Sequence, residues 1–365
     1  MMNVHDLDTP ALIVDLDIME RNLRRVADYA RAHGLRLRPH TKTHKTPALG
    51  RMQLALGAAG LTVAKVGEAE VMAATGTPDL LVAYPVLGER KLARLMEVAR
   101  RTSVTVALDS SPAAQQLSEA AAVAGVRIGV LAEMDAGLHR VGVDPGAPLL
   151  ELVQEIERLP RLEWRGIAFY PGHIKTAGEG ADLALEELSG ILRNSLTLLR
   201  ANGLDPAIIS GGSTPTLFRS HEVAGLNEIR PGTYIFNDRN TVACGACSFA
   251  DCAATILTTV VSTARAGQFI IDGGSKTFSS DRLVTGGDDG FGQIVGMPGA
   301  HFVKMNEEHG FVSLASGSEE LRVGDRIQVV PNHICVAVNL HETIYGVRGE
   351  RVEEAWKVEA RGKLQ

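Results

Sequence analysis

The first 240 residues alternate between short apolar runs and stretches with helical spacing. Eight runs are typical of strands, because each is short and apolar and most are followed by a helical segment. Parallel strands with helical crossovers form either an open doubly wound sheet or a closed barrel. An open dinucleotide-binding sheet needs Gly-x-Gly-x-x-Gly after its first strand, and that motif is missing there. The pattern therefore predicts a (β/α)8 TIM barrel with strands at residues 35–39, 61–66, 80–84, 104–108, 126–131, 164–169, 207–210 and 228–236.

The chain changes character after about residue 240. Short β runs divided by glycine-rich turns continue to the C-terminus without obvious helical periodicity, which predicts an all-β domain. A further strand pattern, Ala-Leu-Ile-Val-Asp at 11–15, precedes the first helical segment at 17–33. We therefore expect two domains: a barrel of residues 15–240, and a β domain of residues 241–365 together with residues 1–14.

Composition contributes mainly by exclusion. The net charge of −6 and the pI near 6.0 disfavour nucleic acid or an anionic membrane as a partner. The chain lacks an apolar run long enough to span a bilayer, and residues 1–8 lack the apolar core of a signal peptide. Four cysteines in 365 residues do not make a disulfide framework, which favours a cytoplasmic location. Cys244, Cys247 and Cys252 lack a nearby fourth zinc ligand and are interpreted as small buried or loop residues.

Several side chains that could take part in catalysis or bind a cofactor follow predicted barrel strands. Loops after the strands of a barrel carry its chemistry, and a lysine there can form a Schiff base. Lys42 follows the first strand in Arg-Pro-His-Thr-Lys-Thr-His-Lys, and Arg140 follows the fifth. Tyr170 and His173 follow the sixth strand. A basic surface loop is the alternative interpretation of the lysine segment.

Two glycine-rich segments lie at the last two predicted strands, where barrels often bind phosphate. Ser213 and Thr214 belong to Ser-Gly-Gly-Ser-Thr, and Gly232 and Thr233 belong to Arg-Pro-Gly-Thr-Tyr. Glycine lets backbone N–H groups approach an anion, and hydroxyl groups add donors. A lysine, a phosphate site and aromatic or imidazole groups at one end of a barrel predict pyridoxal 5′-phosphate (PLP) as cofactor.

These motifs together resemble a known family. Arg-Pro-His-x-Lys, the Gly-Ser-Thr-Pro-Thr run at 212–216 and Pro-Gly-Thr-Tyr at 231–234 resemble fold-type III PLP enzymes. Within that group the chain is similar to eukaryotic-type D-serine dehydratases and D-threonine aldolases, which are distant relatives of alanine racemase. The likeness runs from Asp-Thr-Pro-Ala at 8–11 to Pro-Asn-His-Ile-Cys at 331–335. It implies a TIM barrel joined to a β domain, and a homodimer.

The resemblance also implies roles for individual residues. PLP would be held by Lys42, with Lys45 as a surface or supporting lysine. Thr214, Gly232 and Thr233 would bind the phosphate, with Ser213 beside them. The remaining cofactor contacts would come from His173, close to the pyridine ring, from Tyr170 and from Arg140. Arg140 also has a structural alternative as a salt-bridge partner.

His333 and Cys335 form a His-x-Cys pair. In an extended segment these two side chains point to the same face and can bind one cation. Taken alone, such a pair is more often part of a core. The resemblance favours a metal site, because dehydratases of this group carry His-x-Cys where the typical aldolase has His and Asp. Imidazole and thiolate are borderline-soft ligands, so Zn²⁺ is expected, with the β domain contributing both ligands to the barrel mouth.

The expected function is a PLP- and metal-dependent lyase that acts on a small β-hydroxy-D-amino acid. D-serine-type dehydration to a 2-oxo acid and ammonia is the preferred reaction. The alternatives are retro-aldol cleavage to glycine and an aldehyde, as in D-threonine aldolase, and an amino-acid racemase that needs no metal. A non-catalytic PLP-binding barrel is disfavoured by the β domain.

Overall fold

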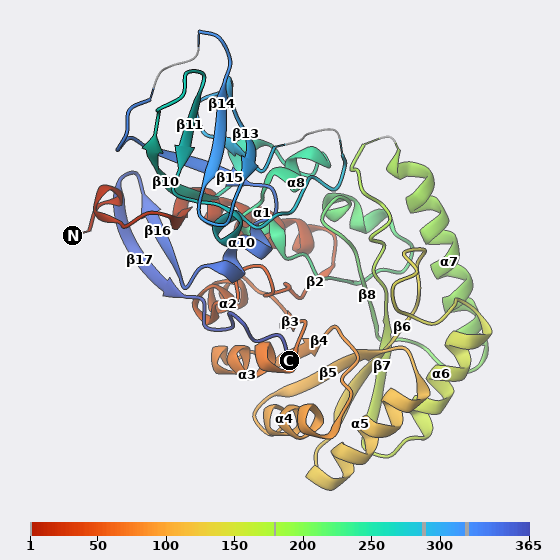
Figure 1. Cartoon of the computed structure of the whole chain (residues 1–365). Coiled ribbons are helices and arrows are strands. Elements are labelled where there is room, and N and C mark those ends of the chain that lie inside the picture. Colours follow the sequence, from red (N-terminus) through yellow and green to blue (C-terminus); the bar gives the residue numbers. More distant parts are fainter. Residues whose placement is uncertain (1, 179, 287–289, 318–320) are drawn as a thin grey trace. The chain divides into compact units, whose positions relative to one another are not determined.

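The computed structural model describes residues 2–178, 180–286, 290–317 and 321–365 (Figure 1). The chain divides into two compact units. Unit 1 comprises Met1–Arg24, Thr43–Lys45 and Thr233–Arg361, and unit 2 comprises Arg25–Lys42, Thr46–Gly232 and Gly362–Gln365. The domain boundaries expected after residues 14 and 240 stay a prediction. None of the helices in the described ranges is long and apolar enough to span a membrane.

Unit 2 contains an eight-stranded parallel sheet in the order β2-β9-β8-β7-β6-β5-β4-β3. The sheet curls until its edges meet: Thr41 N–H donates to Thr62 O and Thr62 N–H donates to Pro39 O, each at 2.8 Å. The predicted (β/α)8 class is thereby confirmed. The strands are β2 (Arg36–Leu37), β3 (Leu61–Val63), β4 (Asp79–Val82), β5 (Ser103–Leu108), β6 (Ile128–Glu133), β7 (Leu162–Ala168), β8 (Ile208–Gly211) and β9 (Glu228–Ile229).

Helices cover the outer face of this sheet (Figure 1). They are α2 (Pro47–Ala55), α3 (Val66–Met72), α4 (Glu89–Ala99), α5 (Ser111–Ala124), α6 (Ala147–Arg158) and α7 (Ala181–Ala201), while α1 (Leu16–Ala32) begins in unit 1 and ends in unit 2. The short 3-10 helices η2 (Ala73–Thr75) and η3 (Leu217–Glu222) also belong to unit 2.

Two local features determine where the barrel strands end and pack. Pro39 and Pro231 follow β2 and β9 closely, and proline cannot donate to a ladder, so both strands are short. Gly166 in β7 has φ +146°, and a Cβ there would lie 1.9 Å from Ile208 O, so only glycine allows β7 and β8 to pair. Inside, Leu81, Ala107, Leu131, Ala168 and Ile208 form a buried cluster.

Unit 1 is built on a nine-stranded sheet in the order β11-β14-β13-β12-β15-β10-β1-β16-β17. Because β11 also pairs with β10, six of its strands close into a barrel in which every pairing is antiparallel. The predicted β domain is thus confirmed. The strands are β1 (Ala11–Asp15), β10 (Ala254–Ser262), β11 (Gln268–Ile271), β12 (Gly292–Ile294), β13 (Ala300–Met305), β14 (Gly310–Leu314), β15 (Arg326–Pro331), β16 (Thr343–Arg348) and β17 (Arg351–Lys357).

The sequence of this domain showed no obvious helix, but the structure contains several short ones. Unit 1 contains α8 (Arg239–Ala243), α9 (Ser275–Phe278) and α10 (Ile334–Leu340), with the 3-10 helices η1 (Val4–Asp6), η4 (Thr233–Ile235) and η5 (Phe249–Asp251). Short helices carry little periodicity, and the sequence of α10, Ile-Cys-Val-Ala-Val-Asn-Leu, is rich in β-branched residues that favour strands.

Candidate active site

The loops at the carboxyl ends of the parallel strands hold most of the predicted site residues of unit 2. All neighbouring strands in this sheet are parallel, so these loops share one end of the unit. The residues at this end are Lys42 after β2, Arg140 after β6, Tyr170 and His173 after β7, Ser213 and Thr214 after β8, and Gly232 after β9.

The two lysines of the first loop have different surroundings. Lys42 is exposed, and among the described residues its amine has no hydrogen-bond or ion-pair partner. Lys45 is buried and its amine donates to Asn339 Oδ1 at 2.8 Å. A lysine that is held in this way is less available for covalent chemistry, so the surroundings favour Lys42 as the reactive amine.

Arg140, Tyr170 and His173 belong to two neighbouring loops. The Arg140 guanidinium lies over the Tyr170 ring, 4.8 Å from its centroid. The His173 ring packs on the backbone of Gly137, where an added Cβ would lie 3.1 Å from the imidazole. The loops after β6 and β7 therefore present a guanidinium, a phenol and an imidazole together.

Glu133 is a candidate that the sequence analysis missed. It ends β6, is only 6% exposed, and accepts no side-chain hydrogen bond from any described residue. Burial raises the pKa of Glu133, although the nearby Arg230 and Arg140 act in the opposite direction. Arg230 in turn donates to Phe169 O at 3.1 Å and to Ser210 Oγ. A carboxylate that ends the otherwise apolar run Ile-Gly-Val-Leu-Ala-Glu was the available signal.

The loop after β8 is short, polar and rich in glycine. Gly212 has φ +97°, a conformation that favours glycine, and Ser213 beside it is buried. Ser213 Oγ lies 3.1 Å from Thr216 Oγ1, and Thr214 O accepts from Leu217 N–H at 3.2 Å. Gly232 is buried as well. These residues therefore provide small, polar and glycine-rich surroundings of the kind that bind phosphate.

Unit 1 brings together residues that are far apart in the chain. Thr43 Oγ1 lies 3.2 Å from Cys335 Sγ, and Thr233 Oγ1 lies 3.7 Å from the same sulfur. Thr43 follows Lys42 in the sequence and Thr233 follows Gly232. Thr233, expected at the phosphate, thus contacts the predicted metal ligand Cys335.

The His-x-Cys pair differs from the expected extended segment. His333 has an extended backbone, but Cys335 already lies in the first turn of α10. Asp238 Oδ2 accepts from the Ile334 N–H at 3.0 Å and thereby caps the start of that helix. The two side chains nevertheless interact. Burial disfavours the charged imidazole, but hydrogen bonding to Cys335, the charges of Cys335 and Asp238 and hydrogen bonding to Asp281 together raise the pKa of His333 to about 9.

The donor set at this pair fits a divalent metal. His333 Nδ1 lies 2.8 Å from Asp281 Oδ2, which leaves Nε2 as the ring atom for a cation. Imidazole and thiolate are established zinc ligands. Within the described ranges no group of three or more His, Cys, Asp or Glu side chains is placed to hold a metal. Catalytic zinc sites commonly have three protein ligands and one open position, so His333 and Cys335 would supply two of the ligands.

The other three cysteines are free thiols. Cys244 and Cys252 are buried and Cys247 is partly buried. A hydrogen bond shared with Cys252 lowers the pKa of Cys247.

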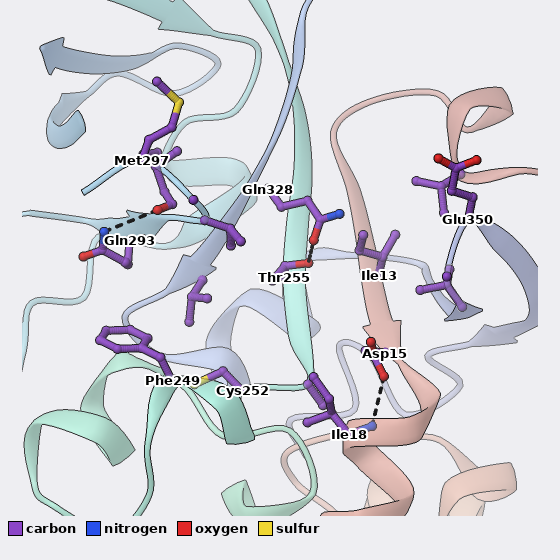
Figure 2. A pocket seen from close by; sticks show the side chains of 18 of the residues that line it. Ile13, Asp15, Ile18, Phe249, Cys252, Thr255, Gln293, Met297, Gln328 and Glu350 are labelled. Carbon is purple, nitrogen blue, oxygen red and sulfur yellow. Dashed lines mark hydrogen bonds between the residues drawn. The ribbon is translucent and has the colours of Figure 1, made fainter. Parts of the chain in front are cut away.

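Unit 1 also contains a cavity of about 750 Å³ that is separate from the predicted site residues (Figure 2). Ile13, Phe249 and Met297 contribute apolar wall, while Thr255 Oγ1 donates to Gln328 Oε1 at 3.1 Å. None of the site residues predicted from the sequence lines it. The cavity therefore contributes nothing to the candidate site.

The residues of unit 2 fit PLP. They offer an exposed amine without a partner among the described residues, a loop with a glycine at positive φ, and a guanidinium stacked on a phenol, which suit a Schiff base, a phosphate and an aromatic ring respectively. The fold and these groups define the class: a PLP-dependent enzyme with an alanine racemase-like barrel.

Comparison with known proteins identifies the family. Residues 14–240 match the alanine racemase N-terminal domain, and residues 253–347 match the putative serine dehydratase domain. D-threonine aldolase from an Arthrobacter species is 34% identical, over 98% of this chain and 93% of that protein. D-threo-3-hydroxyaspartate dehydratase from a Delftia species is 34% identical, over 90% of this chain and 91% of that protein. The chain belongs to this family of PLP-dependent lyases.

Solved structures agree with this assignment. The crystal structure of D-threonine aldolase from Filomicrobium marinum matches with a TM-score of 0.91 and 33% identity, over 99% of this chain and 98% of that one. A metal-free variant of a D-threo-3-hydroxyaspartate dehydratase, with one cysteine replaced by alanine, matches with a TM-score of 0.87 and 31% identity, over 98% of this chain and 99% of that one. The predicted resemblance, fold and enzyme class are confirmed.

Proposed function

We propose that this protein is a PLP- and divalent-metal-dependent lyase that removes the β-hydroxyl of a β-hydroxy-D-amino acid. D-serine-type substrates would end as a 2-oxo acid and ammonia. The observation that carries the proposal is the His333–Cys335 pair, in which the imidazole is oriented by Asp281 and the sulfur is contacted by Thr43. Relatives named as dehydratases and aldolases of hydroxy-D-amino acids support the substrate class.

Lys42 would hold the cofactor and act as the base at Cα. When bound, PLP supplies an electron sink for negative charge that develops at Cα. Once its amine is no longer bound to the cofactor, Lys42 would be free to take the Cα proton. The position of Lys42 on a loop without an ion-pair partner among the described residues suits both tasks.

The neighbouring loops would position the cofactor. Backbone N–H groups of Ser213, Thr214, Gly232 and Thr233, together with the hydroxyls of Ser213 and Thr214, would bind the phosphate. Arg140 and Tyr170 stack on each other and would contact the ring or the substrate carboxylate, with His173 close to the pyridine. These contacts fix orientation, which is a large part of the catalytic contribution of a protein to a cofactor enzyme.

His333 and Cys335 would bind the metal, preferably Zn²⁺, because imidazole and thiolate are borderline-soft. The metal would act as a Lewis acid on the β-hydroxyl, which otherwise is a poor leaving group. Solved variants of D-threo-3-hydroxyaspartate dehydratase support this placement: they replace a histidine and a cysteine separated by one residue, and the cysteine variant is described as metal-free. His333 and Cys335 have the same spacing.

Retro-aldol cleavage is the second candidate. It is favoured by the full-length similarity to the Arthrobacter and Filomicrobium D-threonine aldolases. In that reaction the β-hydroxyl loses its proton and the Cα–Cβ bond breaks, so that glycine and an aldehyde form. The two reactions therefore differ in which bond to the β-carbon is broken.

A substrate panel distinguishes the candidates. D-serine, D-threonine and D-3-hydroxyaspartate are each incubated with the PLP- and Zn²⁺-loaded enzyme, and ammonia and glycine are measured in the same samples. Ammonia with equimolar 2-oxo acid supports dehydration. Glycine with an aldehyde assigns the aldolase reaction, and formation of the L-amino acid without either product assigns a racemase. The expected homodimer is tested separately by light scattering.

A further inference from the structure

Asp281 contacts one of the two proposed metal ligands although no motif predicted it. Its Oδ2 lies 2.8 Å from His333 Nδ1, and the side chains of Asp281 and His333 are 41% and 38% exposed. The two residues are 52 positions apart. The contact therefore depends on how the segment after α9 is held against the start of α10.

Asn332 holds the segment after α9 in place. This residue precedes His333 and is only 1% exposed. Its Nδ2 donates to Asp281 O at 3.0 Å and to Gly290 O at 2.8 Å, and its Oδ1 accepts from Arg239 Nη1 at 2.8 Å. Through these three hydrogen bonds the buried Asn332 amide fixes the backbone of Asp281. Because Asn332 directly precedes His333, it also fixes Asp281 relative to His333.

We propose that Asp281 is a positioning residue that sets the metal affinity of His333. This inference rests on the metal site of the proposed function. By accepting a hydrogen bond from Nδ1, Asp281 holds the ring plane and leaves Nε2 as the ring atom that would face a cation. A carboxylate partner also makes the imidazole a stronger electron donor to the cation.

The alternative role for this contact is an ordinary surface ion pair. Such pairs contribute little to stability, because water screens them and ordering the side chains costs entropy. The two roles predict different consequences. A surface pair would leave metal binding unchanged when it is removed, whereas a positioning residue would change metal affinity much more than the melting temperature.

The test measures Zn²⁺ affinity directly. PLP-loaded wild type, Asp281→Asn, Asp281→Ala and His333→Ala are stripped with a chelator and titrated with Zn²⁺ against a chromogenic competitor. Glu350→Gln is the control, because it removes the same charge from an exposed side chain that pairs with His5. Melting temperature and PLP content are recorded for every variant to confirm the fold.

We expect Asp281→Ala to bind Zn²⁺ roughly 10–100-fold more weakly than wild type. Asp281→Asn keeps an acceptor oxygen and should lose less, and Glu350→Gln should bind like wild type. Wild-type affinity in both Asp281 variants, with weak binding in His333→Ala, would overturn the role of Asp281 alone. Wild-type affinity in His333→Ala as well would show that the proposed metal site is wrong, and the inference would fall with it. If Asp281→Ala does not fold, Asp281→Asn decides.

Discussion

The hydroxyl oxygen of Thr43 lies 3.2 Å from the sulfur of Cys335, 292 residues further along the chain. Thr43 is fully buried and directly follows Lys42, the proposed PLP-bearing residue. A hydroxyl at this distance can donate to a thiolate, and hydrogen bonds to charged groups are stronger than those between neutral groups. On the proposed function, the residue next to Lys42 would thereby stabilise the thiolate form of Cys335, which is the form that would bind a metal.

Removal of this hydroxyl should weaken metal binding. Thr43→Val keeps the shape of the side chain but leaves the thiolate without its donor, so Zn²⁺ affinity should fall about tenfold, the equivalent of about 1.5 kcal/mol. Thr43→Ser retains the hydroxyl and serves as the matched control. Competition titration measures both, and equal affinity in the valine and serine variants would refute the contribution of the hydroxyl.

Lys42 and Lys45 should respond differently to replacement. Borohydride reduction of the holoenzyme followed by peptide mapping should place the cofactor label on Lys42, and Lys42→Ala should lose covalent PLP. Lys45→Ala should keep the label, but it should lower the free energy of unfolding by about 2 kcal/mol because the charged hydrogen bond to Asn339 is lost. A label on Lys45 would reverse the assignment.

Gly232 should tolerate no side chain if it borders the phosphate. Gly232→Val would keep backbone N–H groups away from the anion and should speed the loss of PLP on dialysis. Gly190→Val is a suitable control, since nothing lies within 4 Å of a Cβ added at that position in α7. Equal cofactor retention in the two variants would reject the proposed phosphate site.

His341 should make the fold sensitive to acid. Burial lowers the pKa of His341 below its ordinary value of 6.5, and its Nε2 donates to Thr277 O at 3.2 Å. The unfolded state therefore binds a proton that the folded state resists, so the free energy of unfolding should decrease as the pH falls below about 6.5. Urea denaturation between pH 5 and 8 measures this decrease. His341→Gln keeps a donor without titrating and should reduce the pH dependence; an unchanged pH dependence would show that other groups cause it.

The fold was predictable from the sequence because its signals are local. Most barrel strands are apolar runs followed by helical periodicity, and residues 126–131 differ from β6 by only two positions at each end. The predicted strand 228–236 was too long, because β9 ends at Ile229 and Thr233–Ile235 form η4. The helix α10 was missed because Val336 and Val338 favour strand locally, whereas the cap from Asp238, 96 residues away from Ile334, supports a helix.

The site was only partly predictable, because some of its residues are marked by local sequence signals and others are not. Lys42 and the glycine-rich loops lie next to strand ends and can be found by position. Asp281 and Thr43 matter through contacts with His333 and Cys335, and such contacts between distant segments exist only after folding. Glu133 is an intermediate case. Its charge interrupts an apolar strand and is visible in the sequence, but its arginine neighbours come close only in the folded chain.

The most direct test of the account compares two steps of the reaction in variants of the metal ligands. His333→Ala and Cys335→Ala are loaded with PLP and given D-serine in deuterated water, and Cα-deuterium exchange, ammonia release and bound metal are measured together. In the proposed mechanism proton removal at Cα depends on Lys42 and PLP and not on the metal, so exchange should persist. Ammonia release should fall by roughly 10²–10⁴-fold, because metal polarisation of the hydroxyl contributes several kcal/mol. Full ammonia release from both variants without bound metal would contradict the account.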